Sequence, residues 1–468
     1  GRRREASRCR IYPRKTMRLR KTITTIVATA ILLAGWQLFA VIANQPELIP
    51  SLPRLVRTLC EWLVSGSFYQ SVGATIFRGI LGMSISFVCA IGMAGLFARF
   101  EWVYELFRPL LAIMRSIPVI SFILLALIFL NPESIPLMIA FLTMFPLLTE
   151  NLTRGILDLR PGLSIMARQF HIKRSNVLFQ IIYPQLKPFL YSGLASAAGF
   201  GWRAIIMGEV LSQCAFGIGS EMKRAQNFIA VPELLAWTIV AVFISFFFDK
   251  GISKVADITP KISFANEDQT IPTPTLSVLD TKDISYQYGI QHFSHSFQKG
   301  IIYGISAPSG KGKTTLLNLI GGILLPTEGE IHPTRHFGIA TIFQQPQLLP
   351  YLTAEENIIL PLSSFLTEEK ARRIAQKHLQ EMEMEPFGNR YPKDLIYGQQ
   401  QRIAIARALA YPSPLLLMDE PFKGLDEALS HRIIERIREK QMKEERIILF
   451  TSHNPDEIRL LADEVIYL

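Results

Sequence analysis

Residues 307–315 read APSGKGKTT, and this stretch decides the fold of the C-terminal half of the chain. An apolar segment with strand character precedes it at 301–306, and an apolar segment with helix character follows it at 316–324. Strand, glycine-bearing loop and helix in this order form a cradle for phosphate, because the loop N–H groups and the positive end of the helix face the same anion. The stretch therefore predicts a nucleotide-binding α/β domain with a largely parallel sheet.

Each part of the cradle has an expected contact. Lys313 is expected to reach the β and γ oxygens of a nucleotide, and the Thr314 hydroxyl is expected to bind Mg²⁺. The nucleotide is expected to contact the whole run of Ala307, Pro308, Ser309, Gly310, Lys311, Gly312, Lys313, Thr314 and Thr315. Ala307 stands where this motif normally has glycine. A left-handed φ there costs an L-residue about 1–2 kcal/mol, whereas a negative φ costs little. We expect binding to survive.

An acidic pair follows a second apolar strand at 414–418. Asp419, at the strand tip beside the phosphate cradle, is placed to hold Mg²⁺, and Glu420 is placed to orient or deprotonate the attacking water. A solvated pair at a strand end is the alternative for an isolated Asp-Glu. The cradle upstream favours the catalytic interpretation.

The composition points to a membrane protein in the other half. Of the 468 residues, 49% are hydrophobic and only 19% are charged, whereas about a quarter of an average soluble protein is charged. Residues 251–275 are polar with three prolines, so they are interpreted as a linker before a domain at 276–468. The four cysteines lie far apart without CxxC spacing, which argues against metal or disulfide chemistry.

Six apolar runs indicate a transmembrane domain over residues 22–250. A helix needs about 20 apolar residues to cross a hydrocarbon core about 30 Å thick. The first two runs meet that length, and the other four are shorter when they are cut at charged residues. The expected spans are 22–43, 79–98, 116–130, 134–149, 188–202 and 234–248. A signal peptide is the alternative for the first run, but its length and the later spans favour a retained helix.

The positive charges give the orientation. Residues 1–21 hold ten Lys or Arg and one acid, Glu5. Such a tail can bind nucleic acid, but directly before an apolar span it indicates the cytoplasmic side of a membrane, so no nucleic-acid partner is expected. A second basic cluster lies between the fourth and fifth spans. With six spans, both termini and the nucleotide-binding domain are expected in the cytoplasm. Arg203 and Glu209, near the end of the fifth span, either snorkel to the interface or face a translocation path.

The order of motifs after residue 276 resembles the ATPase domain of ABC transporters. The resemblance implies that Tyr288 stacks on adenine, that Gln344 senses γ-phosphate and Mg²⁺, and that Glu420 and His453 take part in hydrolysis. Residues 395–409, LIYGQQQRIAIARAL, match the signature stretch, whose Gly398 and Gln399 contact nucleotide held by the opposite subunit. Residues 424–426 match the loop that crosses the dimer interface. ATP and Mg²⁺ are thus the expected cofactors.

Residues 22–250 resemble the permease of ABC importers, especially the nitrate, sulfonate and taurine branch. Residues 165–188, IMARQFHIKRSNVLFQIIYPQLKP, align with the cytoplasmic loop that docks in a groove of the ATPase in that family. The resemblance implies a six-helix all-α permease fused to a P-loop ATPase in the inner membrane of a bacterium. It also implies a homodimer or a heterodimer with a related chain, a small solute and an extracytoplasmic solute-binding protein.

Three departures from the family pattern bear on activity. The signature Leu-Ser-Gly-Gly-Gln is replaced by Leu395-Ile396-Tyr397-Gly398-Gln399, so the serine hydroxyl that contacts γ-phosphate is missing. A lost hydrogen bond to a charged group costs about 1.5–3 kcal/mol. Ile165 and His171 replace the glutamate and the glycine of the docking loop. A weakly hydrolysing or regulatory subunit is therefore the alternative to an active importer, and an exporter is a third hypothesis.

Overall fold

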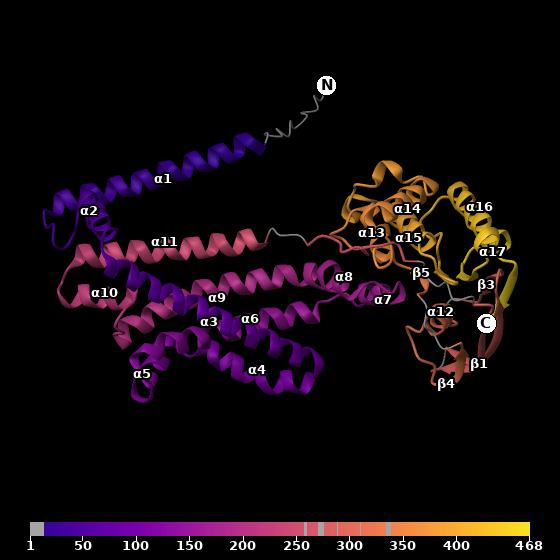
Figure 1. Ribbon diagram of the computed structural model, residues 1–468, viewed down its shortest axis with the longest axis horizontal. Helices are drawn as coiled ribbons and strands as arrows, with labels where there is room; N and C mark the ends of the chain where they lie inside the picture. Colours follow the sequence, from indigo (N-terminus) through magenta and orange to yellow (C-terminus); the bar gives the residue numbers. More distant parts are fainter. Residues whose placement is uncertain (1–13, 257–259, 270–275, 288, 309, 334–337) are drawn as a thin grey trace, which may run out of the picture. The chain divides into compact units, whose positions relative to one another are not determined.

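The computed structural model describes residues 14–256, 260–269, 276–287, 289–308, 310–333 and 338–468 (Figure 1). The chain divides into two compact units. The helical unit comprises residues 1–157 and 188–258, and the α/β unit comprises residues 158–187 and 259–468. The chain thus leaves the helical unit after residue 157, contributes 30 residues to the α/β unit and returns.

The helical unit is built from long apolar helices. Its elements are α1 (Arg14–Ala43), α2 (Leu52–Trp62), α3 (Gly66–Arg99), α4 (Glu101–Ser116), α5 (Val119–Phe129), the 3₁₀ turn η1 (Pro132–Ser134), α6 (Ile135–Leu157), α9 (Tyr183–Ser212), α10 (Ile218–Asn227) and α11 (Val231–Ala256).

Five helices of the described chain are long and apolar enough to cross a membrane, and a sixth span is counted only if a bent pair is taken as one. The pair is α4 and α5, which meet at 95° across a short break. The expected span at 116–130 corresponds to α5 alone, an 11-residue helix. A helix of that length rises only about 17 Å, short of the hydrocarbon thickness. The described residues thus contain five or six candidate spans, and the expected count of six stays a prediction.

Small side chains let α3 and α6 approach closely. The face of α3 buried in the bundle is lined by Ser71, Thr75, Gly79, Gly82, Ser86, Ala90 and Ala94. A Cβ on Gly82 would lie 2.7 Å from Ala140 Cβ on α6, closer than side-chain carbons pack. Small residues at such spacing are typical of helix pairs in membranes, where close van der Waals packing replaces the hydrophobic effect.

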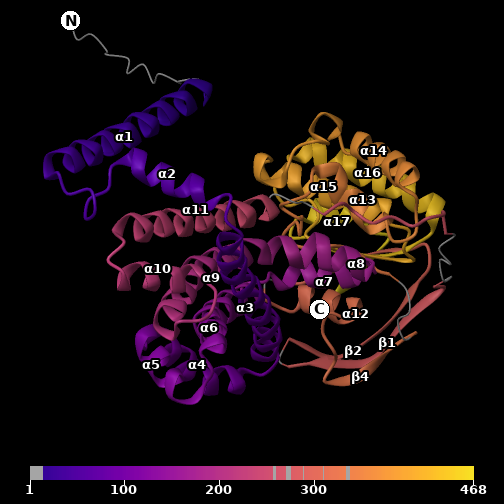
Figure 2. The same cartoon turned by 60° about the vertical axis from the view of Figure 1, so that its left-hand side comes forward.

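The α/β unit contains two sheets and flanking helices (Figure 2). A parallel sheet has the order β5-β6-β7-β3-β8, and an antiparallel sheet has the order β2-β1-β4. The strands are β1 (Val278–Tyr286), β2 (Ile290–Gln298), β3 (Ile302–Ser306), β4 (Glu328–His332), β5 (Ala340–Ile342), β6 (Leu415–Asp419), β7 (Ile447–Thr451) and β8 (Glu464–Tyr467). The helices are α7 (Pro161–Gln169), α8 (Arg174–Asn176), α12 (Lys313–Gly321), α13 (Ala354–Leu362), α14 (Glu368–Glu381), α15 (Tyr397–Ala410), α16 (Glu427–Glu444) and α17 (Pro455–Leu461), with the π-helical turn η2 (Val177–Ile182) and two short 3₁₀ turns, η3 (Glu385–Phe387) and η4 (Pro392–Asp394).

The central strands explain the apolar runs in the sequence. Every residue of β6 and of β7 is buried, as expected for strands covered on both faces. The strand and helix expected around the phosphate cradle form as β3 and α12, with α12 starting three residues earlier than predicted. The segment 251–275, expected to be a linker, departs further from its prediction. Helix α11 runs on to Ala256, and residues 260–269 are ordered against the α/β unit.

Candidate functional site

The phosphate cradle lies between β3 and α12. Gly310 (φ +82°) and Gly312 (φ +89°) have left-handed backbones that favour glycine. Ala307 does not have a left-handed φ, so alanine fits there without strain. Lys313 begins α12 and is 7% exposed, and its Nζ donates to Ala307 O (2.6 Å). The ammonium is thus held inside the loop, where it can meet phosphate oxygens.

A second group joins the tips of β6 and β7 to the cradle. Asp419 Oδ2 accepts from Thr314 Oγ1 (2.9 Å), and Oδ1 accepts from Thr451 Oγ1 (2.8 Å). Burial raises the pKa of Asp419, and the hydrogen bonds from Thr451 and Thr314 oppose that rise. A buried carboxylate beside a hydroxyl offers the hard oxygen ligands that Mg²⁺ prefers. The described residues contain no group of three or more His, Cys, Asp or Glu that could hold a metal ion by itself, so a cation here would take its remaining ligands from phosphate and water.

Glu420 follows Asp419 with a left-handed φ of +47°. Its Oε1 lies 2.9 Å from His453 Nε2, and its Oε2 lies 3.4 Å from Lys423 Nζ. The backbone N–H of Glu420 donates to Thr451 Oγ1 (3.1 Å), the same hydroxyl that donates to Asp419, which fixes Glu420 beside Asp419. A carboxylate oriented in this way can accept a proton from water. Lys423 was not predicted from the sequence, since a lysine near an acidic pair carries no distinctive signal.

Gln344 is exposed and lines a cavity of about 280 Å³ that also includes Thr314 and Asp419. Gly162 and Ile165 of α7 line the same cavity. The segment that resembles a docking loop therefore reaches the wall of the candidate nucleotide site.

The altered signature stretch starts α15. Ile396 occupies the N-cap position and is 72% exposed, and Gln399 Oε1 accepts from its backbone N–H (3.1 Å). The hydroxyl half of a capping box is thus missing. Tyr397 Oη donates to Gln344 O (2.8 Å). Its ring lies against Gly424, whose added Cβ would be 2.7 Å from Tyr397 Cδ1. The bulky ring is therefore accommodated between the loop that carries Gln344 and the loop at 424–426.

The remaining predicted residues differ in exposure, and two of them lie outside the described chain. Pro308 and Lys311 are exposed on the cradle, and Thr315 and Gln399 are half-buried in the first turns of α12 and α15. Gly398 lies against Gly424, where an added Cβ would be 2.6 Å from Gly424 O. Tyr288 and Ser309 lie outside the described residues, so their expected contacts stay predictions.

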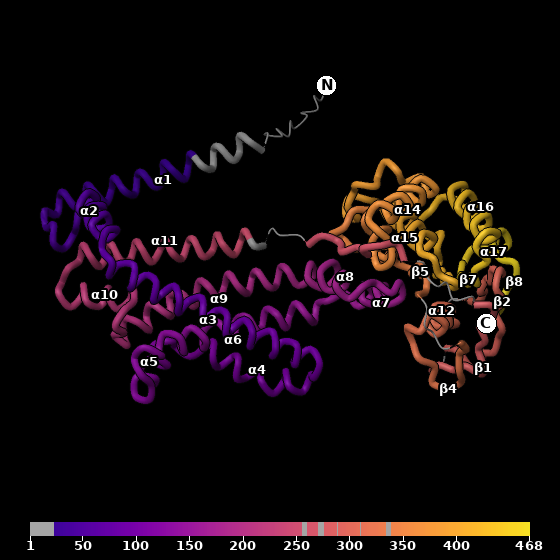
Figure 3. Tube along the Cα trace, in the orientation of Figure 1, coloured from indigo at the N-terminus to yellow at the C-terminus, as the bar shows by residue number. Residues whose placement is uncertain are grey.

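Residues 158–187 pack into the α/β unit, with α7 beside β5 (Figure 3). Phe170 is fully buried, with its ring 5.2 Å from that of Tyr411 and 5.4 Å from the Arg407 guanidinium. Burial lowers the pKa of Arg407 to about 10, and its Nη1 donates to Gln347 O (2.6 Å). Gln169 Nε2 donates to Gly321 O (2.8 Å). The segment is therefore part of the fold of this unit.

His171 stands where the family pattern has glycine, and its backbone conformation shows why glycine suits this position. Its φ is +47°, in the left-handed region where glycine is favoured and another L-residue is strained. The family's glycine at this position suits that backbone. Histidine adopts it here at a cost of about 1–2 kcal/mol.

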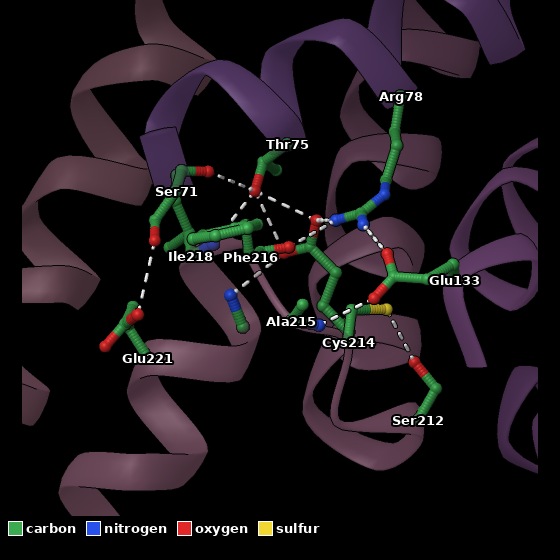
Figure 4. Close-up of polar contacts among 12 residues, drawn as sticks. Ser71, Thr75, Arg78, Glu133, Ser212, Cys214, Ala215, Phe216, Ile218 and Glu221 are labelled. Atoms are coloured by element: carbon green, nitrogen blue, oxygen red, sulfur yellow. Dashed lines mark hydrogen bonds and ion pairs between the residues drawn. The ribbon is translucent and has the colours of Figure 1, made fainter. Parts of the chain in front are cut away.

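A buried ionic network lies in the helical unit (Figure 4). Glu209 on α9 is fully buried and accepts from Arg78 Nη1 (2.7 Å), Thr75 Oγ1 (2.9 Å) and Gly219 N (2.9 Å). Arg78 Nη2 also donates to Glu133 Oε2 (2.6 Å). Within this unit Glu209 is fully buried and its carboxylate is paired, an arrangement that neither interpretation offered above described.

Arg78 was missed because the expected second span was cut at its charge. The helix continues through it, since two carboxylates neutralise the guanidinium. An ionisable residue inside an apolar run is itself a signal of a partner elsewhere in the bundle. Arg203, by contrast, is exposed on α9.

Replacing Arg78 with alanine is expected to destabilise the helical unit by about 3–5 kcal/mol, because Glu209 is left buried without its counter-ion. Thermal unfolding of the full chain in detergent measures the change. Arg57→Gln, at an exposed position of α2, is the matched control. Equal melting temperatures for the two variants would show that the network contributes nothing to stability.

Two protein families match this chain. Residues 290–423 match the ABC transporter family, and residues 82–249 match the family described as binding-protein-dependent transport system inner membrane component. A permease component and an ATP-binding component are therefore joined in one polypeptide.

Curated relatives match the C-terminal half. An uncharacterized ABC transporter ATP-binding protein of Methanocaldococcus jannaschii is 34% identical over 39% of this chain and 85% of its own. The thiamine import ATP-binding protein ThiQ of Yersinia pseudotuberculosis is 33% identical over 41% of this chain and 86% of its own. The Fe(3+) ions import ATP-binding protein FbpC of Rhizobium etli is 34% identical over 38% of this chain, which spans 54% of that relative.

A solved dimeric ATP-binding cassette, in a post-hydrolysis state bound to ADP and Pi, is 31% identical with a TM-score of 0.38. That match covers 41% of this chain and 94% of the solved one.

The site and the matches define an ATP-binding cassette domain fused to a membrane permease. Because the relative from Methanocaldococcus jannaschii is matched over most of its length, this chain belongs to the ABC transporter family.

Proposed function

We propose that the chain is an importer in which ATP hydrolysis by the α/β unit drives a small solute across the cytoplasmic membrane of a bacterium. The observation that carries the proposal is the packing of residues 158–187 into the α/β unit. This segment connects α6 directly to α9, so movement of the α/β unit pulls on two membrane helices. Relatives named for thiamine import and Fe(3+) import support the inward direction.

In this proposal ATP and Mg²⁺ bind between two copies of the chain. Lys313 binds the phosphates, Thr314, Asp419 and Gln344 hold Mg²⁺, and Tyr288 stacks on adenine. Glu420 accepts a proton from water, and His453 orients Glu420. Gly398 and Gln399 of a second copy, or of a related chain in a heterodimer, close the site. An extracytoplasmic solute-binding protein delivers a nitrate-, sulfonate-, taurine- or vitamin-precursor-like solute.

The direction of transport tests the proposal. The full chain is reconstituted in liposomes, and molecules with the α/β unit outside are energised with external Mg-ATP. Labelled taurine and labelled nitrate are loaded inside, together with a periplasmic extract as the source of binding protein. An importer releases solute to the ATP side. In a second sample with the labelled solutes outside, ATP-driven uptake of either solute into the liposomes would identify an exporter instead.

The signature departure gives a separate prediction. Ile396→Ser restores the N-cap hydroxyl, which is worth about 1 kcal/mol to α15, and adds a donor toward γ-phosphate in the opposite site. A hydrogen bond to a charged group is worth about 1.5–3 kcal/mol, so ATP hydrolysis is expected to rise by about 10-fold or more. Steady-state phosphate release measures it.

Leu325→Ser, at an exposed position of the α/β unit outside both the signature and residues 158–187, is the matched control for the added hydroxyl. An unchanged rate in Ile396→Ser would show that this chain does not use the signature hydroxyl that its family uses.

A further inference from the structure

Residues 260–269, here called the strap, lie along two other parts of the α/β unit. The sequence KISFANEDQ at 261–269 is polar, and it was expected to be a linker. Ile262 and Phe264 are nevertheless half-buried and pack against the large hydrophobic cluster of this unit. A flexible tether would leave such apolar side chains in water, so the strap is an ordered part of the fold.

The first attachment joins the strap to the end of α8. Asn176 is 1% exposed, and its side-chain amide pairs with both backbone groups of one strap residue. Asn176 Oδ1 accepts from Ser263 N (2.9 Å), and Nδ2 donates to Ser263 O (2.8 Å). Nδ2 also donates to Ser363 Oγ, at the end of α13 (2.8 Å). This pairing fixes the register of the strap, because a shift by one residue would break both backbone bonds.

Gln180 repeats the contact one turn later. It is 3% exposed, and its Nε2 donates to Pro260 O (3.0 Å). Residues four apart lie on the same face of a helix, so Asn176 and Gln180 present one face to the strap. The face is polar and buried, which is costly unless its groups are paired.

The second attachment joins the strap to the α13–α14 connection. Ala265 N donates to Ser363 O (3.0 Å), and Gln269 N donates to Phe365 O (2.8 Å). Asp268 Oδ1 accepts from Thr367 N (2.9 Å) and from Thr367 Oγ1 (3.0 Å), at the N-terminus of α14. The backbone hydrogen bond from Thr367, followed by smaller contributions that include Lys370, lowers the pKa of Asp268.

The two partners of the strap also touch each other, because Lys173 N donates to Ser364 Oγ (3.0 Å). Three stretches far apart in sequence, 173–180, 260–269 and 363–367, therefore form one hydrogen-bonded layer. The first belongs to the permease sequence, the second joins permease to ATPase, and the third belongs to the ATPase.

We propose that the strap holds residues 158–187 on the ATPase of the same chain, so that each permease is driven by the motor to which it is fused. Residues 158–187 are here called the docking segment. In a dimer, two identical ATPase surfaces are available to each docking segment. A free linker would leave the choice between them open. The strap restricts each docking segment to the ATPase surface of its own chain, since the residues that lead into the ATPase also bind the docking segment. The inference rests on the proposed dimeric transporter.

Disulfide trapping distinguishes the two pairings. Lys173→Cys and Ser364→Cys are combined in the full chain, with Cys9, Cys60, Cys89 and Cys214 replaced by serine, and the protein is oxidised in lipid nanodiscs. Pairing within a chain gives a cross-linked product at the mass of one chain. A product at the mass of two chains would overturn the proposal, and so would the absence of any cross-link. The same product is expected with Lys313→Ala, so failure of the motor leaves this result readable.

Hydrogen exchange tests the strap itself. In the unmodified chain the amides of Ser263, Ala265 and Gln269 are expected to be protected. Asn176→Ala is expected to speed exchange at Ser263 by about 10-fold or more, because both hydrogen bonds between the Asn176 side chain and the Ser263 backbone are lost. Asn176→Asp keeps the acceptor for Ser263 N. Its exchange rate at Ser263 is expected to lie between that of the unmodified chain and that of Asn176→Ala. Protection of β6 and β7 should not change.

Arg174→Ala is the matched control, because Arg174 is exposed on the same short helix. Strap amides that exchange at the rate of an unstructured peptide in the unmodified chain would overturn the proposal. Equal protection in Asn176→Ala and Arg174→Ala would overturn it as well.

Discussion

Replacing Lys313 with alanine is expected to lower ATP hydrolysis by at least about 10²-fold, the usual loss when one pre-positioned cationic or hydrogen-bond donor is removed from a transition state. Lys313 is 7% exposed and its ammonium lies inside the phosphate loop, so water does not replace it easily. Affinity for Mg-ATP should fall as well, because the same charge pairs with phosphate in the ground state. Phosphate release and binding of a fluorescent ATP analogue measure the two effects.

Lys377→Ala is the control for the Lys313 variant. Lys377 is exposed on α14 and pairs only with Glu381 at 3.8 Å among the ion pairs of the described residues. The Lys377→Ala substitution removes the same charge from the same unit and leaves the phosphate cradle unchanged. Comparable hydrolysis in the two variants would contradict a motor role for the phosphate loop.

Glu420→Gln is expected to lower kcat by about 10²- to 10⁴-fold, the range for loss of a positioned general base. The amide keeps the size of the side chain but does not accept the proton of water. Nucleotide binding should persist, because Lys313, Thr314 and Asp419 are unchanged. The combination of retained binding and lost turnover separates this variant from Lys313→Ala.

The structure supplies a second measurement on the same residue. His453 Nε2 lies 2.9 Å from Glu420 Oε1, so His453→Ala should lower kcat less than Glu420→Gln does, with little change in KM. Glu435→Gln, exposed on α16, is the control for loss of a carboxylate. Turnover in Glu420→Gln equal to that of the control would remove Glu420 from the mechanism and favour a subunit that hydrolyses little.

The arrangement of the candidate nucleotide site could be predicted because each of its parts is a short motif with its own local geometry. APSGKGKTT specifies a strand, a loop and a helix, and the acids after 414–418 are placed by the end of a fully buried strand. The parallel sheet then brings β3, β6 and β7 side by side, so Thr314 meets Asp419 across 105 residues of sequence. Local patterns were sufficient there, since parallel strands end at one edge.

The other features depend on contacts with residues far away in the sequence, which no local pattern identifies. Arg78 lies in a membrane helix because Glu209, 131 residues away, pairs with it. Cutting spans at charged residues therefore shortened α3 in the prediction. The strap was interpreted as a linker because its composition is polar, although Asn176 and Ser363 satisfy its backbone. The sequence places Tyr397 in the signature stretch, and only the position of the Gln344 carbonyl shows where its hydroxyl binds.

Coupling between ATP and the membrane helices is tested most directly by labelling a cysteine on α9. Met207→Cys, at a position 42% exposed, is made in the chain without native cysteines and reacted in nanodiscs with a membrane-impermeant thiol reagent. Mg-ATP is predicted to change the labelling rate in this chain and to leave it unchanged when Lys313→Ala is added. Identical rates with and without Mg-ATP in the chain that retains Lys313 would contradict the coupling.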